Sequence, residues 1–283
     1  MAKIKQLYVY PIKSLPGISM PSLAFTPQGF EHDRTFMLID ERSNMVTLRD
    51  YAALAQFDVS FARVNALSVT HPGTGQVHFS LTTPAQGECE EVDVTIHGKQ
   101  SKMALIGMEF DRYFTRALNM PVRLVRSVPW LIRSKHSEQL GADVPLYAQD
   151  GYPMMMLSEE SLAELNRRLA ARFRDPVTMA RFRPNIVVAG DAAHAEDNLS
   201  VLWAGEGGEY EFKRPKLCSR CKAITAYVDG PLRGTFDPDN EPMITLGMYR
   251  RVYREQRDAK IYFGVNVVPT ESGELICDME VTL

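Results

Sequence analysis

The first 125 residues consist of short apolar runs separated by turn residues. The runs are rich in Val, Ile, Phe and Thr and are bounded by Pro-Gly, Gly-Thr-Gly or Ser-Asn, as in IKQLYVYPI, FDVSFARV, ALSVTHPGTGQVHFSLTT and EVDVTIHGKQ. Such runs, each ended by turn residues, are typical of strands joined by hairpins. The clearest hairpin is predicted at the IDERSN turn, between FMLI and MVTL. This part of the chain is therefore expected to fold as β-sheet.

Helical spacing occurs in only a few places. The segment GMEFDRYFTRALNM places Phe110, Phe114 and Leu118 on one face of a predicted helix, which Pro121 would end. The strongest helix is predicted in LSEESLAELNRRLAARF, where Ser158 is a suitable N-cap. A short helical pattern surrounds EPMITLGMYRRVYR, and strands are predicted in NIVVAG, YEFKRPKLCS, AITAYVDG and IYFGVNVVP. The fold class is therefore α+β, mainly β.

Between Val125 and Leu157 the periodicity is lost, and three prolines interrupt the segment. A long irregular stretch inside a compact protein is usually a functional loop or a linker. A chain of 283 residues also exceeds the usual size of one domain. We therefore predict two units, 1–125 and 126–283, with the irregular stretch beside their contact.

The charge and the cysteine content exclude several classes of protein. The chain has 32 basic and 35 acidic residues, and its net charge of -3 favours neither nucleic acid nor an anionic membrane as a partner. The start MAKIKQLYVYPIKS has no apolar signal segment, and no apolar run is long enough to span a bilayer. Four cysteines are too few for a disulfide scaffold. We expect a cytoplasmic protein that acts on a small molecule, without nucleic-acid or membrane partners.

A C-x-x-C pair lies in KLCSRCKAI, at Cys218 and Cys221. A structural zinc site needs about four N or S ligands, and no second pair of cysteines or histidines is evident. A thioredoxin-like pair should begin a helix, whereas the following residues look like a strand. The two thiols could also be ordinary half-buried cysteines, although the neighbouring cations favour a thiolate. The fourth possibility is one thiolate ligand of another metal.

Other polar residues have both ordinary and functional interpretations. Lys13 and Ser14 lie in a turn after a strand, where they could hold a phosphate or simply be solvated. Arg34 could pair with Asp33 or Glu31. Arg183 and Asn185 precede an apolar strand, where they could bind a ligand or cap the strand. The turn DGYP, from Asp150 through Gly151 and Tyr152 to Pro153, is compatible with plain loop chemistry.

Nine segments occur in a characteristic order: LYVYPIKSLPG, GFEHDRTFMLID, NMVTLRD, DGYPMMMLSEESLAELNRRL, RFRPNIVVAG, AEDNLSVLW, LCSRC, EPMITLGMYRR and FGVNVV. In this order the chain resembles the MOSC proteins that carry an N-terminal MOSC β-barrel domain. It is similar to the bacterial YcbX-like proteins and to their relative, the mitochondrial amidoxime-reducing component. The resemblance implies an N-terminal MOSC β-barrel-like domain, residues 1–125, packed on a C-terminal MOSC β-barrel with a few helices, residues 126–283.

The resemblance also implies a cofactor site. It makes Cys221 the catalytic residue and the protein ligand of a molybdenum held by molybdopterin, and Cys218 a structural residue. It assigns contacts with the pterin and its phosphate to Lys13, Ser14, Arg34, Asp150, Gly151, Tyr152, Arg183, Asn185, Ser219, Arg220 and Asn266. Cationic side chains suit the phosphate, and a soft thiolate suits a metal that is also bound by dithiolene sulfur.

The implied activity is the reduction of N-hydroxylated compounds, such as amidoximes, hydroxylamines and N-hydroxylated base analogues, which would serve detoxification. Pyridoxal phosphate is not required, and no iron–sulfur cluster is expected in this chain, so electrons would come from a separate ferredoxin- or flavoprotein-type donor. The alternative function is a non-catalytic module that binds or carries molybdenum cofactor or transfers its sulfur.

Overall fold

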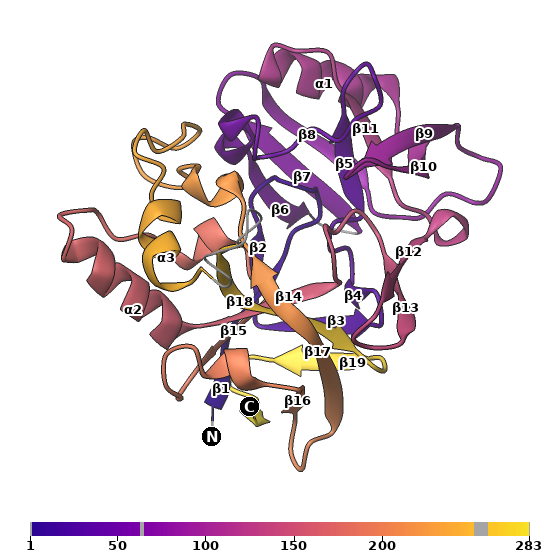
Figure 1. The fold of residues 1–283 in the computed structure, drawn as a ribbon. Coiled ribbons are helices and arrows are strands. Elements are labelled where there is room, and N and C mark those ends of the chain that lie inside the picture. Colours follow the sequence, from indigo (N-terminus) through magenta and orange to yellow (C-terminus); the bar gives the residue numbers. More distant parts are fainter. Residues whose placement is uncertain (1, 63–64, 252–259, 283) are drawn as a thin grey trace.

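Seven strands close into a barrel in a computed structural model of the chain, which describes residues 2–62, 65–251 and 260–282 (Figure 1). The strands follow one another around the barrel in the order β15, β14, β18, β17, β16, β20 and β1, and β1 pairs again with β15. Only β14 and β15 are parallel among these neighbours. The strands are β1 Ala2–Val9, β14 Met154–Ser158, β15 Ile186–Ala189, β16 Val201–Ala204, β17 Tyr210–Ser219, β18 Tyr262–Pro269 and β20 Glu280–Thr282.

The first strand of the chain completes a barrel whose other strands all come from the second half. In β1, Ala2 lies opposite Val281 of β20, and Lys3 lies opposite Ala189 of β15. Ile4 and Leu7 are both fully buried although they lie three positions apart, because the pairing with β15 is irregular between Ile4 and Gln6 and the alternation of burial shifts there. Figure 1 accordingly shows the two ends of the chain close together. The division at residues 125 and 126 stays a prediction, and the barrel draws strands from both sides of it.

The remaining N-terminal strands form two sheets around a shared aromatic core that includes Phe36, Phe57 and Phe114. The four-stranded sheet contains β5 Phe36–Ile39, β11 Arg123–Arg126, β10 Lys99–Leu105 and β9 Glu91–Ile96. The three-stranded sheet contains β6 Asp58–Ala62, β7 Ala66–His71 and β8 Gly75–Ser80. The IDERSN hairpin is present, because Val46 N donates to Leu38 O and Asp40 accepts the backbone N–H groups of its own turn.

Short strands connect the two regions. β2 Ile18–Met20 extends the barrel sheet beside β1, and a separate sheet joins β3 Ser22–Thr26, β4 Gly29–Phe30 and β19 Gly273–Ile276. In this sheet Leu23 lies opposite Leu275, so residues from the two ends of the sequence share one core. Isolated pairing of Ile12 with Phe36 then connects the segment after β1 to the four-stranded sheet.

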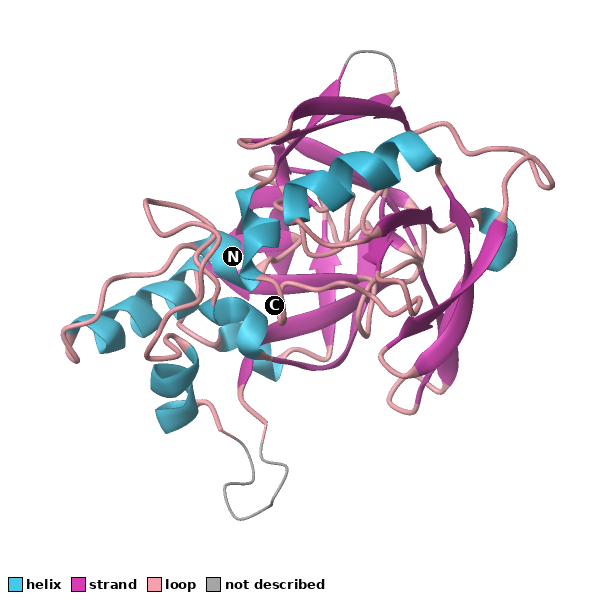
Figure 2. Cartoon of the chain, turned by 90° about the horizontal axis from the view of Figure 1, so that it is seen from above, coloured by secondary structure: helices cyan, strands magenta, loops and turns pink. Residues whose placement is uncertain are grey.

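The three predicted helices are present as α1 Met108–Leu118, α2 Glu159–Ala170 and α3 Met243–Tyr249. Ser158 caps α2 as predicted, since its Oγ accepts the N–H of Ser161, and Leu165 and Leu169 are fully buried. Seen from above, the strands form the body of the molecule and the helices lie against their outside (Figure 2). These findings confirm the mainly β, α+β class. Across the described ranges, no helix is long and apolar enough to cross a membrane.

The stretch Val125–Leu157 is not irregular throughout, which corrects one expectation. It contains a hairpin of β12 Arg133–Ser137 and β13 Ala142–Leu146, paired over five positions from Arg133 and Leu146 to Ser137 and Ala142. The sequence hides this hairpin because its strands form a sheet of only two and Pro145 interrupts the second one. Proline is compatible with such an edge, where its missing N–H is not needed.

The strand predicted in AITAYVDG is wrong. Residues Lys222–Thr225 form a 3-10 helix directly after Cys221, and the segment pairs only at Ala226, with Phe236. Ile224 and Thr225 are buried. Their β-branched side chains therefore reflect burial in the core beside this turn, and not strand pairing. The other short 3-10 helices are Ala52–Gln56, Pro129–Leu131, Met179–Phe182 and Ala195–Asn198.

Candidate functional site

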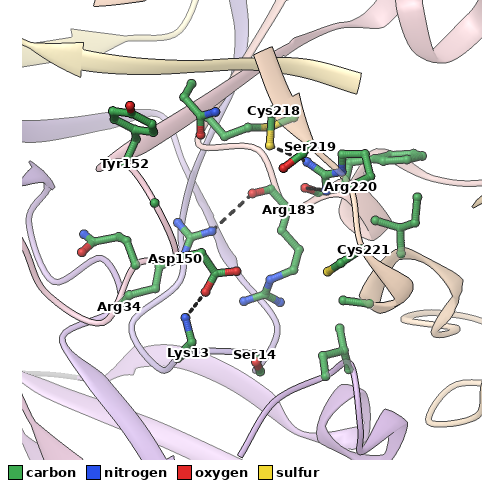
Figure 3. Close-up of a pocket in the computed structure, with 18 of the residues that line it drawn as sticks. Lys13, Ser14, Arg34, Asp150, Tyr152, Arg183, Cys218, Ser219, Arg220 and Cys221 are labelled. Carbon is green, nitrogen blue, oxygen red and sulfur yellow. Dashed lines mark hydrogen bonds and ion pairs between the residues drawn. The ribbon is translucent and has the colours of Figure 1, made fainter. Parts of the chain in front are cut away.

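A cavity of about 550 Å³ lies where the N-terminal sheets meet the barrel (Figure 3). All twelve residues that the sequence analysis selected line it: Lys13, Ser14, Arg34, Asp150, Gly151, Tyr152, Arg183, Asn185, Ser219, Arg220, Cys221 and Asn266. They come from the segment after β1, the turn before β5, the turn before β14, the approach to β15, and strands β17 and β18. The structure thus brings these distant segments together, and the roles of the residues remain to be proposed.

Lys13 is buried in the cavity wall and is held by two acceptors. Its Nζ donates to Ala148 O at 2.7 Å and forms an ion pair with Asp150 (Figure 3). Burial lowers the pKa of Lys13, which Asp150 partly offsets. Burial also acts to raise the pKa of Asp150, but Lys13 and His97 outweigh it, and the pKa of Asp150 lies well below its usual value. Lys13 is therefore bound to the protein and is not a freely solvated lysine.

Two cavity residues that the sequence analysis missed also contact Asp150. Arg49 Nη2 lies 3.2 Å from Asp150 Oδ2, and His97 Nε2 lies 2.9 Å from Oδ1. Burial acts to lower the pKa of Arg49, but interactions with Asp150 and Cys221 outweigh it and raise the pKa. Arg49 therefore interacts with both the Asp150 carboxylate and the Cys221 thiol. The only sequence signal is position, because Arg49 follows a predicted hairpin and His97 occupies the turn between β9 and β10.

Arg34 and Arg183 stack against the ring of Tyr10. Their guanidinium carbons lie 4.2 Å and 4.4 Å from the ring centroid, and Tyr10 Oη donates to Pro184 O at 3.0 Å. Arg34 also pairs with Asp33, at 2.6 Å, as its ordinary interpretation predicted. Burial and the neighbouring charge of Arg34 lower the pKa of Arg183 to about 10. Tyr10 thus orients two guanidinium groups toward one wall of the cavity.

The amide of Asn185 is occupied by protein groups. Its Oδ1 accepts from Arg34 Nη1 at 3.1 Å and from Met155 N at 3.2 Å, while its Nδ2 donates to Tyr8 O and to Asp33 Oδ1. An amide has about this bonding capacity, and Asn185 is almost fully buried. The geometry therefore favours a positioning role for Asn185, which orients Arg34.

Asn266 and the DGYP turn complete the wall beside β17. Asn266 Nδ2 donates to Leu217 O at 3.2 Å and to Lys216 O at 3.4 Å, where β17 and β18 pair irregularly. Gly151 and Tyr152 follow Asp150 into the cavity, and the ring of Tyr152 is 6% exposed. Asn266 thus supports the backbone of the strand that leads to the two thiols.

The two thiols have different surroundings. Cys218 lies on β17, packs against an apolar cluster, and receives an N–H from Arg220 Nη1 at 3.1 Å from its sulfur. Arg220 Nη2 also donates to Phe182 O at 2.7 Å. Cys221 follows Ser219 at the end of β17 and lines the cavity just before the 3-10 helix. All four cysteines are free. Both thiols thus line the cavity, but Cys218 is also engaged by Arg220 and the apolar cluster, whereas Cys221 interacts with Arg49.

The donors around Cys221 suit an anionic, acceptor-rich group. The structure gives Arg183 Nη2 and Arg220 Nε no hydrogen-bond partner among the residues it describes, although both atoms are buried. Buried donors of this kind normally have acceptors. The described ranges also contain no group of three or more His, Cys, Asp or Glu side chains that could hold a metal. The unpartnered donors beside Cys221 are therefore the feature of this wall that fits an acceptor-rich ligand.

Two family models together match most of the chain. Residues 1–121 match the family model of the MOSC N-terminal beta barrel domain, and residues 143–282 match that of the MOSC domain. Mitochondrial amidoxime-reducing component 1 of Mus musculus is 31% identical over 263 residues, which cover 87% of this chain and 71% of that protein. The Homo sapiens protein of the same name is 30% identical over 275 residues, which cover 92% and 74%.

A second kind of relative is also similar. Molybdenum cofactor sulfurase of Oryza sativa subsp. japonica is 29% identical over 279 residues, which cover 93% of this chain. The chain spans 32% of the length of that protein. Relatives named for two different functions therefore match most of this chain.

Proposed function

Because the chain belongs to the MOSC family, with the MOSC N-terminal β-barrel domain followed by the MOSC domain, we propose that it is a molybdenum-cofactor-dependent reductase of N-hydroxylated compounds. The observation that carries the proposal is the meeting, in one cavity, of an available thiol, Cys221, with guanidinium donors that lack acceptors, those of Arg183 and Arg220. Two relatives named as amidoxime-reducing components support the same reaction class.

Cys221 would be the thiolate ligand of the metal, and Arg183 and Arg220 would donate to the pterin and its phosphate. Lys13 and Ser14 would contact the same cofactor from the opposite wall. The bound cofactor supplies the two-electron chemistry that removes the N-linked oxygen as water. The protein would hold the cofactor in position through side chains that are already oriented, such as Arg183, which stacks on Tyr10.

The cavity residues also determine where charge and protons can reside. Asp150 is shared by Lys13, Arg49 and His97, so its carboxylate stays ionised and cannot readily supply a proton near neutral pH. His97 is the only histidine that lines the cavity in the described part of the chain, and its side chain and that of Asp150 are both partly exposed. Substrates would be amidoximes, hydroxylamines or N-hydroxylated bases, and a separate protein would deliver the electrons.

The first experiment measures metal content and turnover together. Protein from a host that makes the cofactor should contain nearly one molybdenum per chain and reduce benzamidoxime with a chemical electron donor. Cys221→Ser should lose the molybdenum and the turnover, because the metal loses its protein ligand. Cys218→Ser is the matched control and should keep most of both, because Cys218, although it also lines the cavity, already interacts with Arg220 and packs against the apolar cluster. Equal losses in the two variants would contradict the assignment.

The similarity to molybdenum cofactor sulfurase favours one alternative, a module that binds or carries the cofactor or transfers its sulfur without turnover of its own. Metal-loaded protein that never reduces benzamidoxime, but passes cofactor to an apo-enzyme, would support this alternative. Turnover that depends on Cys221 would exclude it as the main function.

A further inference from the structure

Two lysines flank the ring of Tyr152 in the cavity wall. Lys135 Nζ lies 4.7 Å from the ring centroid, and Lys216 Nζ lies 5.4 Å from it. Lys135 belongs to β12 and Lys216 to β17, so the ring lies between two separate sheets. Tyr152 is itself held, because its hydroxyl lies 3.2 Å from Ser137 Oγ. The contacts therefore place two ammonium groups around one immobilised ring.

These charges have no described counterion. Lys135, Lys216 and the nearby Lys260 all line the cavity, and within the described ranges none of them forms an ion pair or donates a side-chain hydrogen bond. Burial and the like charge of Lys216 lower the pKa of Lys135, with smaller contributions from Lys99, Arg133 and Lys260. Like charges held together in a concave site attract an anion. Among the described residues, this cluster of lysines therefore has no carboxylate partner.

The acidic side chain in the cavity wall already has other partners. Asp150 is the only carboxylate among the described residues that line the cavity, and it is shared by Lys13, Arg49 and His97. Figure 3 shows Tyr152 well apart from Cys221, on the other side of Arg183. An anion held at Tyr152 would therefore be a separate group from whatever reacts at Cys221.

We infer that Lys135 and Lys216, around Tyr152, form a subsite for a phosphate or carboxylate group, to which Lys260 adds positive charge from elsewhere in the cavity wall. The inference rests on the proposed function for the identity of its ligand. The anionic group has two possible sources, a charged substituent on the N-hydroxylated substrate or the terminal phosphate of the cofactor. Ammonium groups on flexible stems bind either one as point charges.

The test removes two charges and keeps a matched control. Lys135→Gln with Lys216→Gln is compared with Lys102→Gln and Lys213→Gln, which remove two exposed lysines from β10 and β17 that do not line the cavity. Three quantities are measured on protein from a host that makes the cofactor. They are molybdenum per chain, the KM ratio of 4-carboxybenzamidoxime to benzamidoxime, and the calorimetric Kd ratio of 4-amidinobenzoate to benzamidine.

If the anion belongs to the substrate, the cavity variant should contain as much molybdenum as its control. Its preference for the carboxylated compounds, measured by the KM ratio and by the Kd ratio, should fall by at least about fivefold. A cofactor phosphate predicts a fall in molybdenum content in the cavity variant and not in the control. Either result supports the subsite and identifies its source. A cavity variant equal to its control in all three quantities would overturn the inference. The proposed function fails separately, when neither amidoxime is reduced, because molybdenum content and the Kd ratio do not require turnover.

Discussion

Asp150 interacts with three basic side chains of the cavity wall. It is the shared partner of a buried lysine, an arginine that reaches Cys221, and a histidine at the rim. Lys13 would otherwise be a buried charge without a counterion, which is unfavourable in a protein interior. The carboxylate therefore contributes both to the shape of the cavity and to the stability of the chain.

We predict that Asp150→Asn lowers the free energy of unfolding at pH 7 and that the difference narrows in acid. The pKa of Asp150 in the folded protein lies below its usual value of 3.8, so the ionised carboxylate stabilises the fold above that pH. This stabilisation is lost as the pH falls from about 3.8 through the folded pKa. Urea unfolding at pH 7, 5, 3.5 and 2.5 measures the effect, which should be equal at pH 7 and 5 and smaller at the two lower values. Asp143→Asn, at an exposed position of β13, is the control, and a difference that does not vary with pH contradicts the prediction.

At the scale of elements, the N-terminus of α2 is held by a buried polar group. Ser158 Oγ accepts from Ser161 N at 3.1 Å and donates to Glu196 Oε2 at 3.0 Å, and Ser161 Oγ donates to Glu196 Oε1 at 2.7 Å. Burial raises the pKa of Glu196, which the two serines partly offset. The cap therefore joins α2 to the segment Ala195–Asn198 without any contribution to the cavity.

Ser158→Ala should lower the free energy of unfolding by about 1–2 kcal/mol, because it removes the cap and leaves Glu196 with one hydroxyl fewer. Molybdenum content should stay unchanged, since Ser158 does not line the cavity. Urea denaturation measures the first quantity and metal analysis the second. Ser158→Thr keeps a capping hydroxyl and should lose less stability. An equal loss in the two variants would show that packing at this position, and not the cap, is responsible.

At the scale of the whole molecule, the barrel needs both ends of the chain. Without β1, the strands β15 and β20 would each lose a neighbour and expose unpaired backbone groups. The apolar face of β1, which includes Ile4, Leu7 and Val9, would also be missing from the core. The second half of the sequence therefore holds six of the seven barrel strands but not a closed barrel.

We predict that residues 126–283 alone do not unfold cooperatively. The same fragment followed by a short glycine-rich linker and residues 1–31 should regain a cooperative transition, because Ala2 lies opposite Val281 and a short connection can join the two ends. Thermal unfolding followed by circular dichroism measures both fragments. A linked fragment whose residues 1–31 are shuffled in order is the control. Cooperative unfolding of 126–283 by itself would contradict the prediction.

Local patterns in the sequence predicted much of this molecule. The strands of alternating burial, the IDERSN hairpin, the cap at Ser158 and the three helices depend on neighbours in the chain, and their signals are correspondingly local. The resemblance to the MOSC proteins, which rests on the order of nine segments, also selected twelve residues. All twelve line one cavity in the structure. Where the local signal was weak, as in the β12–β13 hairpin, or reflected burial, as in Ile224, the prediction failed.

The tertiary structure decided what depends on distance in space. Closure of the barrel by β1, the contacts of Arg49 and His97 with Asp150, and the two lysines around Tyr152 all join positions far apart in the chain. A charged residue in a turn looks the same in sequence whether it points to solvent or into a cavity. Only the packing of distant segments against one another gives such a side chain its partners, because electrostatic and hydrogen-bond energies depend on separation and burial, not on sequence order.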